Sequence, residues 1–115
     1  MVASASVAGK LERGLELIRR GEFFEAHEEL ETAWRAAVPE ERDFFQGLVH
    51  VAVAWYQAGR GNANGCGRQL AKARRRLQAF APSHRGVDVA EVLRQVESAA
   101  GLVDSGSLEL PPPVL

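Results

Sequence analysis

A histidine and a glutamate spaced four residues apart are the side chains of this sequence best placed to do chemistry. If residues 23–38 form a helix, this spacing puts His27 and Glu31 beside each other on its surface. On a helical wheel, both positions fall within the apolar arc of that helix. Because a buried carboxylate is costly unless it is paired or hydrogen-bonded, we predict that His27 and Glu31 form a buried polar cluster.

The next helical segment, near residues 39–58, supplies further polar groups. It is apolar over most of its circumference, which predicts a central helix with neighbours on several sides. Its narrow polar stripe includes Gln46 and His50, which are again four residues apart. If that stripe faces the preceding helix, Gln46 and His50 converge on His27 and Glu31.

Two interpretations of this cluster lead to different functions. Two histidines and a carboxylate are the ligand set of a zinc or non-haem iron site, so His27, Glu31 and His50 are candidate metal ligands. A histidine beside a carboxylate is also a candidate general base. The zincin motif HExxH is absent, however, because Glu31 stands where the second histidine belongs.

A buried histidine–glutamate pair can equally serve to hold two helices together, and the polar stripe can simply face water. We prefer this simpler interpretation, which predicts a non-enzymatic binding or interaction module. The alternative is a small metal-dependent or hydrolase-like enzyme centred on His27, Glu31 and Gln46.

The spacing of apolar residues and of helix-ending residues divides the chain into five helices. No alternating pattern predicts a strand, so the predicted fold class is all-α: a compact antiparallel bundle in a single domain, residues 1–103. Residues 104–115 contain three consecutive prolines, which predict an extended tail that is either docked on the bundle or loose. The five segments lie near residues 7–20, 23–38, 39–58, 63–80 and 87–103.

Residues 17–39 and 55–82 resemble each other in their order of helix end, glycine turn, helix and proline. This order is similar to the helix-turn-helix pattern of tetratricopeptide repeats. Because the full repeat pattern is absent, we interpret it as evidence for helical hairpins rather than for a peptide-binding superhelix. Asn62 follows the second glycine turn and is the predicted N-cap of the helix after it.

Composition and charge restrict the partners that we expect. The formal net charge is -1, which does not favour nucleic acid or an anionic membrane as a partner. The longest apolar stretch, residues 48–56, is too short to span a bilayer, and residues 1–10 lack the pattern of a signal peptide. The single cysteine, Cys66, excludes an internal disulfide. We therefore expect a soluble cytoplasmic protein without a cofactor, in which the many apolar helical faces suit a homodimer or a protein partner.

Three motifs of the sequence resemble domain-of-unknown-function family 309. They are FFEAHEELETAW (residues 23–34), RDFFQGLVHVAVA (residues 42–54) and GNANGCGRQLAKA (residues 61–73). Cys66 replaces the usual alanine of the family, and His50 falls where the family often has glutamine. The resemblance implies a compact helical bundle and no particular activity. It marks as candidate functional or structural residues His27, Glu28, Glu31, Trp34, Gln46 and Asn62.

Overall fold

Five α-helices make up most of the chain, which confirms the all-α prediction. A computed structural model describes residues 2–115, with side chains from residue 7 onward. Within these residues there is no strand, only an isolated bridge between His84 and Val87. The α-helices are α1 (Val2–Arg19), α2 (Phe23–Ala36), α3 (Arg42–Gly59), α4 (Ala63–Leu77) and α5 (Val89–Asp104), and short 3₁₀ turns cover Pro39–Glu41 and Gln78–Phe80.

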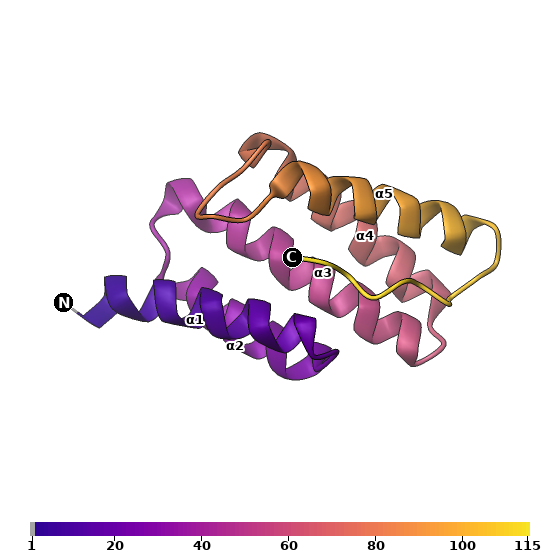
Figure 1. The fold of residues 1–115 in the computed structure, drawn as a ribbon, viewed down its shortest axis with the longest axis horizontal. Helices are drawn as coiled ribbons and strands as arrows, with labels where there is room; N and C mark the ends of the chain where they lie inside the picture. Colours follow the sequence, from indigo (N-terminus) through magenta and orange to yellow (C-terminus); the bar gives the residue numbers. More distant parts are fainter. Residues whose placement is uncertain (1) are drawn as a thin grey trace.

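Each helix packs mainly against the next one along the chain: α1 on α2, α2 on α3, α3 on α4 and α4 on α5. In the view of Figure 1, α1 and α5 flank α3 below and above, with α2 partly behind α1 and α4 partly behind α5. The last residues of the chain run between α1 and α5 and cross in front of α3 (Figure 1). No helix among residues 2–115 has both the length and the hydropathy that a membrane span requires.

The predicted central helix is α3, which lies between α2 and α4. Its buried side chains point to several neighbours, and Phe44, Phe45 and Leu48 have no exposed surface. This agrees with an apolar pattern that extends around most of the helix, because such a helix must be covered on several sides.

Glycines allow the helices to approach closely at two crossings. A Cβ atom on Gly14 of α1 would lie 2.6 Å from Cγ of Leu30, and a Cβ on Gly47 of α3 would lie 2.5 Å from Cγ of Leu77. Leu30 and Leu77 are fully buried and have little room to move. Gly47, one of the residues that resemble the family pattern, therefore sets the spacing between α3 and α4.

Replacing Gly47 with alanine is expected to destabilise the protein by about 1–3 kcal/mol, because overpacking must push Leu77 out of its place. Gly67 of α4 is the matched control, since a Cβ there meets nothing within 4 Å. Gly67→Ala should instead stabilise the protein by about 0.5–1 kcal/mol through the higher helix propensity of alanine. Urea unfolding followed by circular dichroism measures both changes. Equal effects of the two substitutions would contradict the close crossing.

Candidate functional site

His27 and Glu31 do not form the predicted buried pair. Both side chains are half-buried on α2, and no polar or charged residue among those described is fully buried. Nδ1 of His27 donates to the carbonyl oxygen of Phe24 at 2.6 Å. Glu31 accepts from Nη2 of Arg35 at 3.1 Å. The carboxylate is thus satisfied by an exposed arginine one turn further on, and the imidazole by a main-chain group.

The prediction that His27 and Glu31 are buried was wrong, because α2 buries only a narrow stripe of its surface. Its buried residues are Ala26, Leu30 and Ala33, which lie between α1 and α3. His27 and Glu31 lie at the edge of this stripe, where water reaches them. Residues at the margin of an apolar arc are exposed whenever the neighbouring helices cover only the middle of it.

The polar stripe of α3 does not face α2 at His50, so the condition for a converging cluster is not met. Nδ1 of His50 donates to Oε1 of Gln69 at 2.7 Å, so this part of the stripe faces α4 and not α2. Burial is the main cause that lowers the pKa of His50, and it favours the neutral imidazole. Within the described residues, no hydrogen bond joins Gln46 to His27 or Glu31.

The candidate metal ligands are therefore not brought together. Across the part of the chain that the structure describes, no three histidine, cysteine, aspartate or glutamate side chains are arranged to hold a metal ion. The set of His27, Glu31 and His50 fails because His50 packs toward α4 while the other two lie at the edge of α2.

The other candidate residues cap a helix, pack against the core or lie exposed on the surface. Oδ1 of Asn62 accepts from the amide of Gly65 at 2.9 Å, which confirms the predicted N-cap of α4. Trp34 is half-buried and packs against the core. Glu28 is exposed, and its main-chain carbonyl accepts a hydrogen bond from Thr32.

His27 instead borders a small aromatic groove between α2 and α3. The ring of Phe24 lies 5.0 Å from that of His27 and 5.5 Å from that of Tyr56, measured between centroids. Phe24 is 45% exposed, which is unusual for so large an apolar side chain. The groove has a volume of about 200 Å³ and is lined by Phe23, Phe24, His27, Val53, Tyr56 and Gln57.

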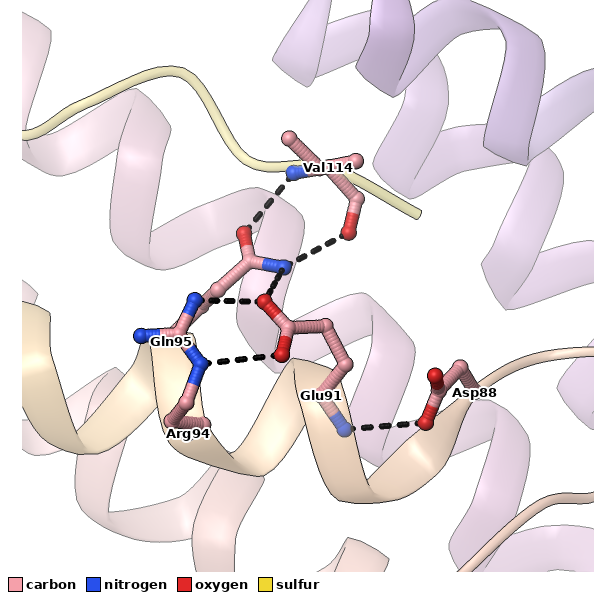
Figure 2. A network of polar contacts seen from close by, with 5 residues as sticks. All are labelled: Asp88, Glu91, Arg94, Gln95 and Val114. Carbon is pink, nitrogen blue, oxygen red and sulfur yellow. Dashed lines mark hydrogen bonds and ion pairs between the residues drawn. The ribbon is translucent and has the colours of Figure 1, made fainter.

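A second and more elaborate groove, which the sequence did not reveal, holds the chain's own tail. Nε1 of Trp55 in α3 donates to the carbonyl oxygen of Pro111 at 2.9 Å. Gln95 of α5 makes two hydrogen bonds with the main chain of Val114: its Nε2 donates to the carbonyl at 2.7 Å, and its Oε1 accepts from the amide at 2.8 Å. Figure 2 shows both contacts.

The end of the tail contacts α1. The guanidinium of Arg19 donates to the Leu115 carbonyl oxygen through Nε at 3.1 Å and Nη2 at 2.8 Å. Pro113 is buried, whereas the side chain of Val114 is 70% exposed. The tail is therefore held by main-chain hydrogen bonds to residues of α1, α3 and α5, by the buried Pro113, and by the side chains of Leu108, Leu110 and Leu115, which pack against the core.

Gln95 is held in position by its own helix. Its Nε2 also donates to Glu91 at 3.2 Å, and Glu91 pairs with Arg94 (Figure 2). At the start of α5, Asp88 caps the helix by accepting from the Glu91 amide at 3.1 Å, while the Glu91 side chain contacts Arg94 and Gln95. Between the tail and α5 lies a cavity of about 210 Å³.

One signal for this groove was present in the sequence. Trp55 lies in an apolar helix and is only 6% exposed, and a buried indole N–H usually needs an acceptor. The carbonyl groups of a polyproline segment are free, because that conformation makes no internal hydrogen bonds. The acceptor could not be identified from sequence, because Pro111 is 56 residues away along the chain.

A charged clamp at the start of α3 was also missed. Glu41 accepts from Arg85 through both oxygens, at 2.6 and 2.8 Å, and from Nε2 of His84 at 2.8 Å. The hydrogen bond from Arg85 is the main cause that lowers the pKa of Glu41 to about 2. The clamp fixes the loop before α5, in which His84 also packs edge-on against Phe44 and Phe80.

These features define a class: small all-α proteins in which consecutive antiparallel helices leave a groove that can hold an extended segment. The chain belongs to the family described as domain of unknown function (DUF309), whose model matches residues 11–68. That range includes all six candidate residues as well as Arg19 and Trp55, but neither α5 nor the tail.

A relative in Bacillus subtilis (strain 168), the uncharacterized protein YpuF, is 38% identical over 68 residues. The match covers 58% of this chain and 37% of the relative, so this chain spans just over a third of that protein. No solved structure matches the chain.

His27→Ala is expected to cost no more than about 1 kcal/mol of stability, because the imidazole is half-buried and its one hydrogen bond is to a main-chain carbonyl. Leu30→Ala on the same helix is the matched comparison and should cost about 2–5 kcal/mol, because Leu30 is fully buried. Thermal and urea unfolding measure both. A loss for His27→Ala as large as that for Leu30→Ala would restore the idea of a buried pair.

Glu41→Gln is expected to destabilise the protein by about 1–3 kcal/mol at neutral pH, because it weakens the contacts with Arg85 and His84. A carboxyl whose folded pKa lies below its unfolded value stabilises the fold above the unfolded pKa, about 4.5, and loses this contribution as the pH falls toward 2. The difference between wild type and Glu41→Gln should therefore shrink between pH 5 and pH 2.

Urea unfolding at several pH values measures this difference. The exposed neighbour Glu40 is the matched control, and Glu40→Gln should change the stability by less than about 0.5 kcal/mol at neutral pH. A wild-type advantage over Glu41→Gln that is independent of pH would show that the clamp does not depend on the Glu41 charge.

Proposed function

We propose that this chain is a non-enzymatic protein-binding module that binds an extended protein segment in the groove formed by α1, α3 and α5. One observation carries the proposal: the groove already holds such a segment, the chain's own tail, through side chains from all three helices. Helices that pack in succession expose their alternate members along one face, and repeat proteins use such faces for binding.

The contacts are of the kind that recognises a main chain. Gln95 both donates to and accepts from Val114, as a neighbouring strand would. Trp55 donates to the carbonyl of Pro111, and aromatic-lined grooves that bind polyproline segments use the same stiff, preformed conformation. Such contacts do not require that the bound segment belong to the same chain.

The enzymatic alternative centred on His27, Glu31 and Gln46 has less support. A general base needs a partner that orients it, and a reacting group within reach. Here the Nδ1 proton of His27 is directed to the carbonyl of Phe24, and Glu31 is paired with Arg35. Neither contact links the three residues into a working unit.

The proposal is tested with the full-length chain carrying Pro113→Asp, which places a charge at a buried tail position and should release the tail. A labelled peptide with the sequence of residues 107–115 is titrated against it, and fluorescence anisotropy reports binding. We expect saturable binding. A further Trp55→Phe substitution should weaken it about three- to tenfold, because one hydrogen bond is lost.

A peptide carrying lysine in place of the valine is the matched control and should bind about equally well, because the Val114 side chain is 70% exposed. Circular dichroism establishes that the Pro113→Asp chain is folded. A folded chain that shows no saturable binding of either peptide at millimolar concentration would rule out the proposed function.

A further inference from the structure

Charge is distributed unevenly between the two helices that flank α3. The sequence of α2 contains four glutamates and one arginine, whereas α4 contains five basic residues and no acidic one. Because the whole chain has a formal net charge of only -1, this separation is a property of the two helices and not of the chain. The molecule therefore has one acidic and one basic helix, each packed against α3.

Both helices border the same side of α3. The half-buried stripe of α3 contacts α4 at His50, which is hydrogen-bonded to Gln69. The same stripe meets α2 at the aromatic groove, where Val53 lies beside Phe24. Trp55, which binds the tail, points roughly 160° away from Val53 around the helix. The face formed with α2 and α4 is therefore distinct from the groove that holds the tail.

Five exposed charged side chains of these helices make no ion pair within residues 7–115. They are Glu25 and Glu28 of α2, and Arg68, Lys72 and Arg75 of α4. Each of the other charged residues of the two helices is in an ion pair, two of them with residues outside α2 and α4 on α3 and α5. The five are therefore charges that the fold itself does not use.

The packing of α2 gives the level of each acidic charge along α3. The rings of Phe24 and Tyr56 lie 5.5 Å apart, and the two helices run in opposite directions. Glu28 follows Phe24 by one turn, so it is about level with Ala52, which precedes Tyr56 by one turn. Glu25 lies about one turn nearer the end of α3.

The basic charges of α4 lie at corresponding levels on the other side of His50. Gln69 is hydrogen-bonded to His50, and α4 also runs in the opposite direction to α3. Lys72 follows Gln69 by about one turn, so it is about level with Gly47, and Arg75 lies about one turn nearer the start of α3. Along α3, the acidic and basic charges are therefore about equally far from His50.

We propose that this face binds a second copy of the chain about a two-fold axis near His50. An axis perpendicular to the face places α2 of one copy over α4 of the other in antiparallel orientation, and it repeats the same contact. Glu28 then lies opposite Lys72 of the second copy, and Glu25 lies opposite Arg75. A two-fold interface must be self-complementary, and opposite charges at equal distances from the axis meet this condition.

The same arrangement covers exposed apolar surface. Phe24, which is exposed, precedes Glu28 by one turn and so faces the arginine-rich end of α4 in the second copy. Guanidinium groups pack favourably on aromatic rings. The neighbouring Tyr56 already makes such a contact within the chain, where Cζ of Arg60 lies 5.6 Å from the ring centroid.

A polyanion is the other partner that suits a basic helix, but it does not suit this face as a whole. A nucleic acid that covers both α4 and the stripe of α3 meets the glutamates of α2 on the far side of the stripe. A second copy pairs both sets of charges at once. Complementary charges of this kind determine which partner is selected and how it is oriented.

Sedimentation velocity of the full chain tests the dimer. Exposed ion pairs are screened by salt, so we expect a dimer at about 0.01 M salt, where the Debye length is about 30 Å, and a monomer at about 1 M, where it is about 3 Å. Glu28→Lys and Lys72→Glu should each weaken dimerisation about tenfold or more, because each places like charges opposite one another twice. Glu12→Lys makes the same charge change where α1 faces the loop before α5, and this matched control should dimerise like wild type.

Mixing the two variants tests the pairing itself. Glu28→Lys has a cation at both positions and Lys72→Glu has an anion at both, so a mixed pair matches opposite charges in both contacts. An equimolar mixture should therefore restore the dimer, as should the double variant Glu28→Lys/Lys72→Glu. Circular dichroism establishes that each variant is folded.

Three results would overturn the inference. The first is a wild-type chain that stays monomeric at low salt, and the second is a mixture of folded variants that stays monomeric where wild type dimerises. The third is a monomeric wild type that binds a labelled single-stranded RNA and loses this binding in Lys72→Glu, which would assign α4 to a polyanion.

The dimer is also separable from the proposed function. Pro113→Asp releases the tail from the other side of α3 and should dimerise like wild type. Loss of the dimer in this variant, if it is folded, would place the contact on the tail side and would likewise count against the face described here.

Discussion

The fold depends on the need to cover α3 on every side. This helix is apolar around most of its circumference, and its buried residues extend from Phe44 to Ala58. The helices α2 and α4 cover two sides. The side that faces between α1 and α5 remains, and there the indole N–H of Trp55 also needs an acceptor. The tail covers this side of α3 with the buried Pro113, and its Pro111 carbonyl accepts the hydrogen bond from Trp55.

Local patterns in the sequence predicted the parts of the fold that depend on neighbours along the chain. Five helices, the N-cap at Asn62 and the central position of α3 follow from periodicity and from turn residues, which act over a few residues. The docked tail did not follow, because Trp55 and Pro111 are 56 residues apart and no local rule pairs them. The clamp between Glu41 and Arg85 was missed for the same reason.

The candidate site shows where a helical wheel misleads. A wheel gives the direction of a side chain but not the width of the surface that neighbouring helices cover. His27 and Glu31 lie within the apolar arc of α2, yet only Ala26, Leu30 and Ala33 are buried there. The same spacing of four residues that suggested a His27–Glu31 pair also places Arg35 within reach of Glu31, and an arginine is the stronger partner for a carboxylate.

The clamp between Glu41 and Arg85 also shapes the surface beside α1. Glu41 stands at the start of α3, and Arg85 belongs to the loop before α5, which borders a hollow beside α1. The clamp therefore fixes the surface formed by this loop as well as the start of α3. Two charge-assisted hydrogen bonds from Arg85 thus hold the loop between α4 and α5 against the start of α3.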